Sequence, residues 1–303
     1  MSTTDRNLGY YCLEMKYYRR KKDIPFFKIG LFVKFLSFIN TDLSPQKKMW
    51  KNNNTNKSMG LDSYKAYKKG NNKFVEIIFK SCKFHHSPNY MSSDDGSERE
   101  SDKEPNEGEK ELTHVLCKEG RDELVIILEE RRSGVPITSI VKYFNHFLPL
   151  FWDNNEYGEN KKIIITYSRI PIDDLEGAIQ NLTRICSSEI FTHKKILGSP
   201  VLGFLDEDDA NMEDEIVVSC KVKRGESLRK RTGRKLYELA IAEERRVERV
   251  RIKGKDEKGV GVTIDTYFTK RKESVEVPVD ELKGIVNSDA IFKEMEKLLL
   301  NEK

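Results

Sequence analysis

Short stretches rich in β-branched and aromatic residues recur along the first two thirds of the chain. Such stretches, bounded by turn residues, predict β-strands. The tripeptide EGR joins two of them, which is typical of a β-hairpin. The stretches predicted as strands are residues 10–18, 72–80, 112–118, 122–130 and 161–170.

Segments with helical spacing of apolar residues separate some of these strands. We expect helices at residues 29–39, 136–148 and 171–186. Each of the last two begins with a proline, which is tolerated at the first helical position because the N–H there has no helical acceptor. Residues 44–72 are polar and irregular, and we expect no regular element in them.

The last third of the chain shows one strand, one helix, three strands and a final helix. The sequence therefore predicts an α+β fold of mixed sheets with helices packed on them. We expect an N-terminal domain of residues 1–200 and a smaller, basic, βαβββα-like domain of residues 201–303, with Ser288 as the N-cap of the last helix. The elements of the second domain are predicted at 215–223, 226–243, 247–254, 261–269, 273–279 and 288–300.

Charge is segregated along the chain, although the net charge is only +4. Residues 216–272 hold eighteen Lys or Arg against eight Asp or Glu. The stretches 92–111 and 205–215 together hold sixteen acidic residues against three basic ones. Residues 92–111 contain too few apolar residues to offset the entropy of ordering, so we expect a flexible loop. For 205–215 two interpretations stay open, a solubilising loop and an internal phosphate mimic that covers the basic faces.

Two basic faces coincide in the C-terminal domain. In a helix over 226–243 the leucines fall on one side and the cations on the other. In the following strand, alternation places the basic residues on one face and Val250 and Ile252 on the other. Such arrays of cations bind phosphate backbones, and the alternative is an ordinary solvated surface. The candidate nucleic-acid-binding residues are Arg229, Lys230, Arg231, Arg234, Lys235, Arg249, Arg251 and Lys253.

Little in the sequence indicates catalysis, and no cofactor is expected. The five cysteines are widely spaced without a C-x-x-C pair, so we expect neither a metal site nor a disulfide framework. The motifs of nucleotide-binding loops, nucleophile elbows and zinc proteases are absent. We expect His114 to be structural. One alternative is a metal nuclease centred on Asp122, Glu129 and Arg131, because clustered carboxylates bind Mg²⁺.

The apolar segments are too short to cross a bilayer. The longest apolar run near the start, residues 29–39, contains Lys34 in its middle, and no signal peptide opens the chain. We therefore expect a cytoplasmic protein without membrane insertion.

The region after the basic helix contains a strand, a K-D-E-x-G turn, a strand with Thr and Tyr, and a short strand that leads to a proline. The residues concerned are Lys255, Asp256, Glu257, Gly259, Thr263, Tyr267 and Pro278. In this arrangement the segment 252–281 resembles the matching region of the RexA family of phage-exclusion proteins. The resemblance implies a cytoplasmic, dimeric, sequence-tolerant DNA-binding protein of antiphage defence, with the basic residues of 229–255 as its DNA face.

Together these features predict a nucleic-acid-binding protein that acts on duplex DNA without catalysis. We expect little sequence preference, because no helix presents residues arranged for base edges. A role in antiphage defence and a homodimeric state are implied by the resemblance. The alternative is a protein-interaction subunit of a multi-component defence system, whose charged patches dock on a partner protein.

Overall fold

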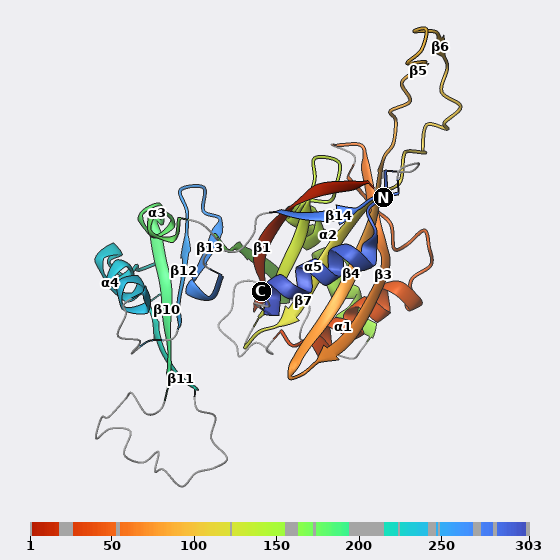
Figure 1. Ribbon diagram of the computed structural model, residues 1–303. Helices are drawn as coiled ribbons and strands as arrows, with labels where there is room; N and C mark the ends of the chain where they lie inside the picture. Colours follow the sequence, from red (N-terminus) through yellow and green to blue (C-terminus); the bar gives the residue numbers. More distant parts are fainter. Residues whose placement is uncertain are drawn as a thin grey trace, which may run out of the picture. The chain divides into compact units, whose positions relative to one another are not determined.

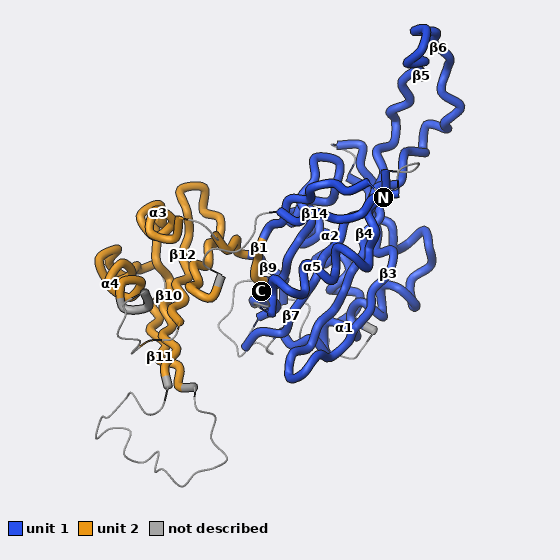
Figure 2. Tube along the Cα trace, in the orientation of Figure 1, with its two compact units in different colours: residues 1–9, 13–167, 273–303 blue, residues 10–12, 168–272 orange. Residues whose placement is uncertain are grey.

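The chain has an α+β fold built on a large mixed sheet, and it divides into two compact units (Figures 1 and 2). Unit 1 comprises residues 1–9, 13–167 and 273–303, and unit 2 comprises residues 10–12 and 168–272. The computed structural model describes residues 2–17, 27–52, 55–121, 123–154, 163–171, 174–193, 215–223, 225–241, 247, 249–268, 274–280 and 284–300.

The sheet of unit 1 has the strand order β9-β1-β8-β7-β4-β3-β2, and β14 pairs antiparallel with β1. β3, β4, β7 and β8 form an antiparallel meander. A separate small ladder joins β5 and β6. The strands are β1 (Thr3–Tyr17), β2 (Trp50–Asn52), β3 (Lys57–Lys69), β4 (Asn72–Lys83), β5 (Tyr90–Met91), β6 (Glu98–Arg99), β7 (Glu111–Glu119), β8 (Leu124–Glu130), β9 (Ile163–Arg169) and β14 (Ser274–Pro278).

Helices cover both faces of this sheet. On one face, α2 (Ile137–Asn154) packs on Phe79 of β4 through an edge-to-face contact of Tyr143. α1 (Ile29–Ser37) packs on α2 through an edge-to-face contact of Phe32 with Phe144. Phe79 lies opposite Thr113 of β7, so the next residue, His114, points to the other face. There it contacts Phe292 of α5 (Ser288–Leu300), which lies across the sheet in Figure 1. His114 is thus buried between β7 and α5.

Unit 2 contains a four-stranded ladder in the order β11-β10-β12-β13, with antiparallel neighbours. Two helices pack on it and enclose an aliphatic core formed by Ile179, Ile185, Val250, Ile252 and Ile264 among others. The elements are α3 (Leu175–Gln180), β10 (Arg184–His193), β11 (Glu215–Lys221), α4 (Lys230–Ile241), β12 (Arg249–Lys255) and β13 (Gly261–Asp265), followed by the 3-10 turn Thr266–Phe268.

The predicted order of elements in the last third is found, but its last two elements lie in unit 1. β14 pairs with β1, and α5 packs on β7 and β14. The chain returns to unit 1 because these two elements are apolar on one face and find their partners there. The bounds of the two compact units therefore differ from those of the predicted domains, residues 1–200 and 201–303.

Three local predictions need correction. Residues 57–69, expected to be irregular, form β3, because this segment pairs along its whole length with β4. The helix expected at 171–186 ends at Gln180, and the chain continues as β10 from Arg184. The acidic stretch 92–111, expected to be a flexible loop, includes the two residues of β6 and the first residue of β7.

Candidate nucleic-acid interface

Helix α4 presents one apolar and one cationic face, as the sequence indicates. Leu236 and Tyr237 pack against the aliphatic core of unit 2. Gly233 is buried on the same side, and a Cβ placed there would lie 3.1 Å from Ile185 Cδ1. This glycine therefore lets α4 approach the sheet closely.

Four exposed cations lie on α4 and a fifth lies immediately before it, and two of the four are in the first turn of the helix. Arg229 immediately precedes the helix, and Lys230 and Arg231 begin it, with no acidic residue in that turn. The N-terminus of a helix carries a partial positive charge, so cations there destabilise the helix by about 0.3–1 kcal/mol each. The same combination of free N–H groups, helix dipole and cations is favourable for an anion. The exposed cations are Arg229, Lys230, Arg231, Arg234 and Lys235.

Four of these cations line a groove between α3 and α4 with a volume of about 660 Å³. Lys230 Nζ donates to the Gln180 carbonyl at 2.6 Å. Arg234 pairs with Glu176 at 3.3 Å and with Glu238 at 3.1 Å, and all three side chains are about half exposed. Among the described residues, Arg229, Arg231 and Lys235 have no carboxylate partner. The groove therefore keeps a net excess of positive charge toward solvent.

The basic side chains of β12 have a different environment, which corrects two of the predicted contacts. Arg249 donates from Nε and Nη2 to the two carboxylate oxygens of Asp265, at 2.7 and 2.6 Å. Arg251 Nε donates to Asp265 Oδ2 at 2.8 Å, and its Nη1 lies 3.7 Å from Glu189 Oε2. Arg251 is only 3% exposed. The two arginines are thus ion-paired with carboxylates of unit 2, and we interpret Arg249 and Arg251 as structural.

Asp265 is fully buried below these two guanidinium groups. Burial by itself raises its pKa, but the hydrogen bonds and charges of Arg249 and Arg251 outweigh this effect and hold the pKa below the ordinary value. The Phe191 ring lies 4.7 Å from the Arg249 guanidinium and covers it. The cluster of Arg249, Arg251, Asp265 and Glu189 is formally neutral.

The predicted site thus separates into two sets. Lys230, Arg231, Arg234 and Lys235 come together in the groove beside α4, and Arg229 immediately precedes this helix. Arg249 and Arg251 instead belong to the cluster around Asp265. Lys253, on the same strand, is half-buried opposite Thr263. The acidic stretch 205–215, with the exception of Glu215, lies outside the described residues, so its role as a phosphate mimic stays a prediction.

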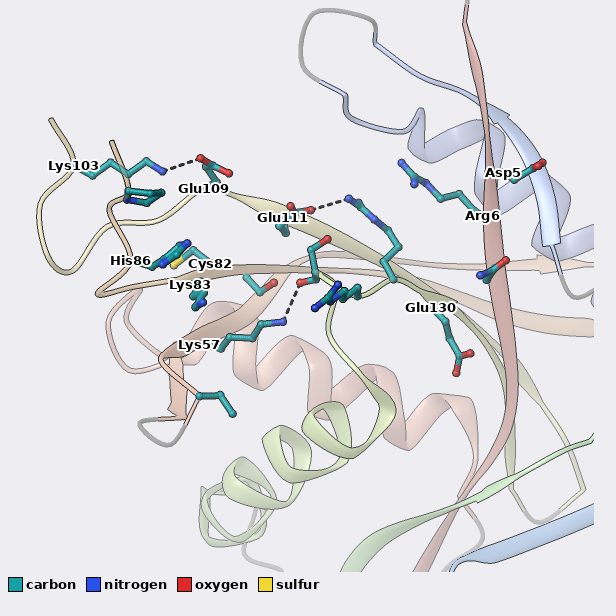
Figure 3. A pocket seen from close by; sticks show the side chains of 17 residues that line it. Asp5, Arg6, Lys57, Cys82, Lys83, His86, Lys103, Glu109, Glu111 and Glu130 are labelled. Carbon is teal, nitrogen blue, oxygen red and sulfur yellow. Dashed lines mark hydrogen bonds and ion pairs between the residues drawn. The ribbon is translucent and has the colours of Figure 1, made fainter. Parts of the chain in front are cut away.

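A cavity of about 860 Å³ lies in unit 1 and was not predicted from the sequence (Figure 3). Its walls come from β1, from the ends of β3, β4, β7 and β8, and from the adjoining loops. Two of the basic lining residues are ion-paired with acidic lining residues. Lys103 pairs with Glu109 at 2.8 Å and Arg131 pairs with Glu111 at 3.0 Å. The wall is therefore of mixed charge, and a basic surface for a polyanion is better developed on α4.

The described residues of the alternative nuclease, Glu129 and Arg131, do not form a metal site. Glu129 is 1% exposed, and its Oε2 contacts His114 Nδ1 at 2.7 Å. Asp122 lies outside the described residues. Among the residues that the structure describes, no group of three or more His, Cys, Asp or Glu is placed to hold a metal ion. All five cysteines are free thiols.

No family model matches this chain, and no curated protein is significantly similar to it. In the described part of the chain, every helix is too short or too polar to span a bilayer.

Proposed function

We propose that the chain binds the phosphate backbone of nucleic acid, duplex DNA in the first place, through the cationic face of α4. The observation that carries this proposal is the set of exposed cations at the N-terminal half of one helix, without an acid in its first turn. Such an arrangement costs helix stability, and an anionic ligand would offset that cost.

The chemistry of the groove supports phosphate as the ligand. Cations that release bound counterions from a polyanion give sequence-independent affinity that falls with salt. Arg229, Arg231 and Lys235 are the side chains best suited to this role, because no carboxylate competes for them among the described residues. Little sequence preference is expected, because long flexible cations contact phosphates rather than base edges. The resemblance of 252–281 to the RexA family extends the proposal to antiphage defence in the cytoplasm.

The test compares two triple variants with the same change of net charge. Arg229→Gln, Arg231→Gln and Lys235→Gln remove the three unpaired cations of α4. Lys65→Gln, Lys68→Gln and Lys293→Gln remove three exposed cations of unit 1. Binding of labelled duplex DNA is measured by fluorescence anisotropy at several salt concentrations.

We expect the α4 variant to lose about 10- to 100-fold in affinity and to reduce the slope of log K against log[salt] by about 2–3. The unit 1 variant should retain the slope. An equal loss in both variants would show that only net charge matters, and absence of binding by the unmodified protein would remove the proposal.

The second candidate is a protein-interaction subunit, and strand β11 favours it. Within the described chain, β11 pairs only with β10, and Val218 on it is 42% exposed. An open strand edge can accept a strand from a partner. Copurification from cells after nuclease treatment distinguishes the two candidates: a partner retained after digestion and lost on Val218→Lys favours the protein partner.

A further inference from the structure

Three side chains of unit 1, distant in sequence, form a continuous hydrogen-bonded series. Ser288 Oγ lies 2.8 Å from His114 Nε2. On the other side of the ring, His114 Nδ1 lies 2.7 Å from Glu129 Oε2. A hydroxyl, an imidazole and a carboxylate in this order are the parts of a nucleophile activated by a general base.

The surroundings of the ring determine which nitrogen carries the proton. Glu129 is an acceptor, so the proton of the neutral ring lies on Nδ1, and Nε2 is left to accept the Ser288 hydroxyl. The Glu129 carboxylate is itself held, because Oε2 also accepts the backbone N–H of His114 at 3.3 Å. Arg6 Nε is ion-paired with Oε1 at 3.2 Å. The imidazole is therefore oriented as a base toward Ser288.

Ser288 is not used to cap its helix, contrary to the sequence prediction. The side chain of Asn287 accepts the N–H of Ala290 at 3.0 Å and takes that role. Ser288 is the first residue of α5, where the partial positive charge of the helix N-terminus favours an alkoxide. It is partly exposed, whereas His114 is 1% exposed. Ser288 is thus the most exposed residue of the series.

A small cavity of about 330 Å³ adjoins this series, and His114 forms part of its wall. Leu112, Ile285 and Val286 give the wall an apolar part, and Val286 lies two residues before Ser288. The charged lining residues Glu109, Lys110, Glu111 and Arg131 cancel in sign. The volume is at the lower end of small-ligand sites, and the lining fits a small uncharged molecule.

We propose that Ser288 and His114 form a catalytic pair that hydrolyses small, uncharged carboxylic esters, with Glu129 as the positioning residue. Ser288 Oγ attacks the carbonyl carbon while its proton passes to His114 Nε2. The carbon–oxygen bond to the alcohol breaks, and the alcohol leaves with that proton. Water then attacks the acyl-serine, gives its proton to the same nitrogen, and releases the carboxylic acid and the Ser288 hydroxyl.

The test is covalent labelling of the full chain with a fluorophosphonate. This reagent forms a phosphorus–oxygen bond with an activated serine and loses fluoride. We expect a single adduct by intact mass, located on Ser288 by peptide mapping and absent in Ser288→Ala. The matched control is Ser139→Ala, because Ser139 is also partly buried in the first turn of a helix, α2. This variant should still form the adduct on Ser288, and no adduct should be found on Ser139 in the unmodified protein.

Hydrolysis of p-nitrophenyl acetate gives the second readout, with an expected loss of at least about 100-fold in Ser288→Ala and in His114→Gln. Imidazole added to His114→Ala should restore part of the rate, which a purely structural histidine would not permit. Circular dichroism confirms that each variant is folded. Absence of any adduct in the folded unmodified protein, or an adduct that persists in Ser288→Ala, would overturn the proposal. Either result leaves DNA binding through α4 untouched, because that surface lies in unit 2.

Discussion

Helix α4 and strand β12 are both rich in cations and follow each other in unit 2, yet their charged side chains have different surroundings. On α4 the cations are exposed, and three of them have no carboxylate partner among the described residues. On β12 two arginines surround one buried carboxylate, Asp265. The first arrangement leaves positive charge available to a ligand, whereas in the second the positive charge is neutralised by a carboxylate of the same unit.

The difference shows that the position of acids, rather than the density of bases, decides whether a basic face can bind a polyanion. An arginine with a bidentate carboxylate partner is already satisfied, and a phosphate would have to displace that partner. An exposed arginine at a helix N-terminus gains from a phosphate without breaking an existing bond. The three predictions below start from this contrast.

Asp265→Asn should have the largest effect, since it leaves two guanidinium groups over a neutral amide. Removing one partner of a buried ion pair costs about 3–5 kcal/mol. We expect a loss of this size in the stability of unit 2, measured by hydrogen exchange of peptides that cover β12 and β13. Glu257→Gln is the control, because Glu257 is exposed in the turn between these strands. It should change stability by no more than about 0.5 kcal/mol.

If Asp265→Asn lowers the stability of unit 2 by less than about 1 kcal/mol, the two arginines do not depend on Asp265, and Arg249 is again a candidate contact for phosphate.

The partner of Arg251 could have been found from the sequence. The K-D-E-x-G turn closes between Lys255 and Gly261, with Gly259 at φ +74°. Counting outward from this turn in an antiparallel hairpin places Arg251 opposite Asp265, which is the observed register. Alternation along one strand correctly separated its basic and apolar faces. It carried no information about the neighbouring strand.

Elements with a hydrophobic pattern of their own could be predicted from the sequence. Predictions were wrong where the pairing of strands, rather than the local pattern, determines the structure. The hairpin of β7 and β8 and the strand β4 follow their own apolar runs. The second half of β3 is exposed and therefore lacks an apolar run that would predict a strand. The sequence signal for this strand is the two-residue turn Gly70–Asn71, which pairs β3 with β4. The helix predicted at 171–186 extends into the first three residues of β10, because Pro171 and the acids after it indicate that a helix begins but not where it ends.

The series of Ser288, His114 and Glu129 was beyond sequence reasoning. Its members lie on α5, β7 and β8, and His114 and Ser288 are 174 positions apart. No motif links them, because the chain brings α5 back to unit 1 only through the pairing of β14 with β1. The α4 cations, by contrast, are neighbours in sequence, so helical periodicity alone assembled them.

Acid should weaken the β12 cluster before it affects the α4 surface. The pKa of Asp265 is lowered in the folded protein, so its contribution to stability is complete above its unfolded pKa of about 3.9 and is lost as the pH falls through the folded value. The stability difference between the unmodified protein and Asp265→Asn should therefore be constant from pH 7 to pH 5 and shrink below about pH 4. Urea unfolding at these values measures it. A difference that already shrinks between pH 7 and pH 5 would assign the effect to another group.

Glu238→Gln should have the smallest effect on stability and therefore gives the sharpest contrast with Asp265→Asn. Both changes replace a carboxylate that faces an arginine by an amide. The pair of Glu238 and Arg234 is about half exposed on α4, and such surface pairs contribute about 0–1 kcal/mol. Unfolding should thus be almost unchanged, while affinity for duplex DNA rises about two- to threefold, because one repulsive charge leaves the groove and Arg234 is released toward the phosphate. Anisotropy titrations at low salt measure the gain. If affinity does not change, Arg234 remains bound to Glu176, and the phosphate contacts are confined to Arg229, Arg231 and Lys235.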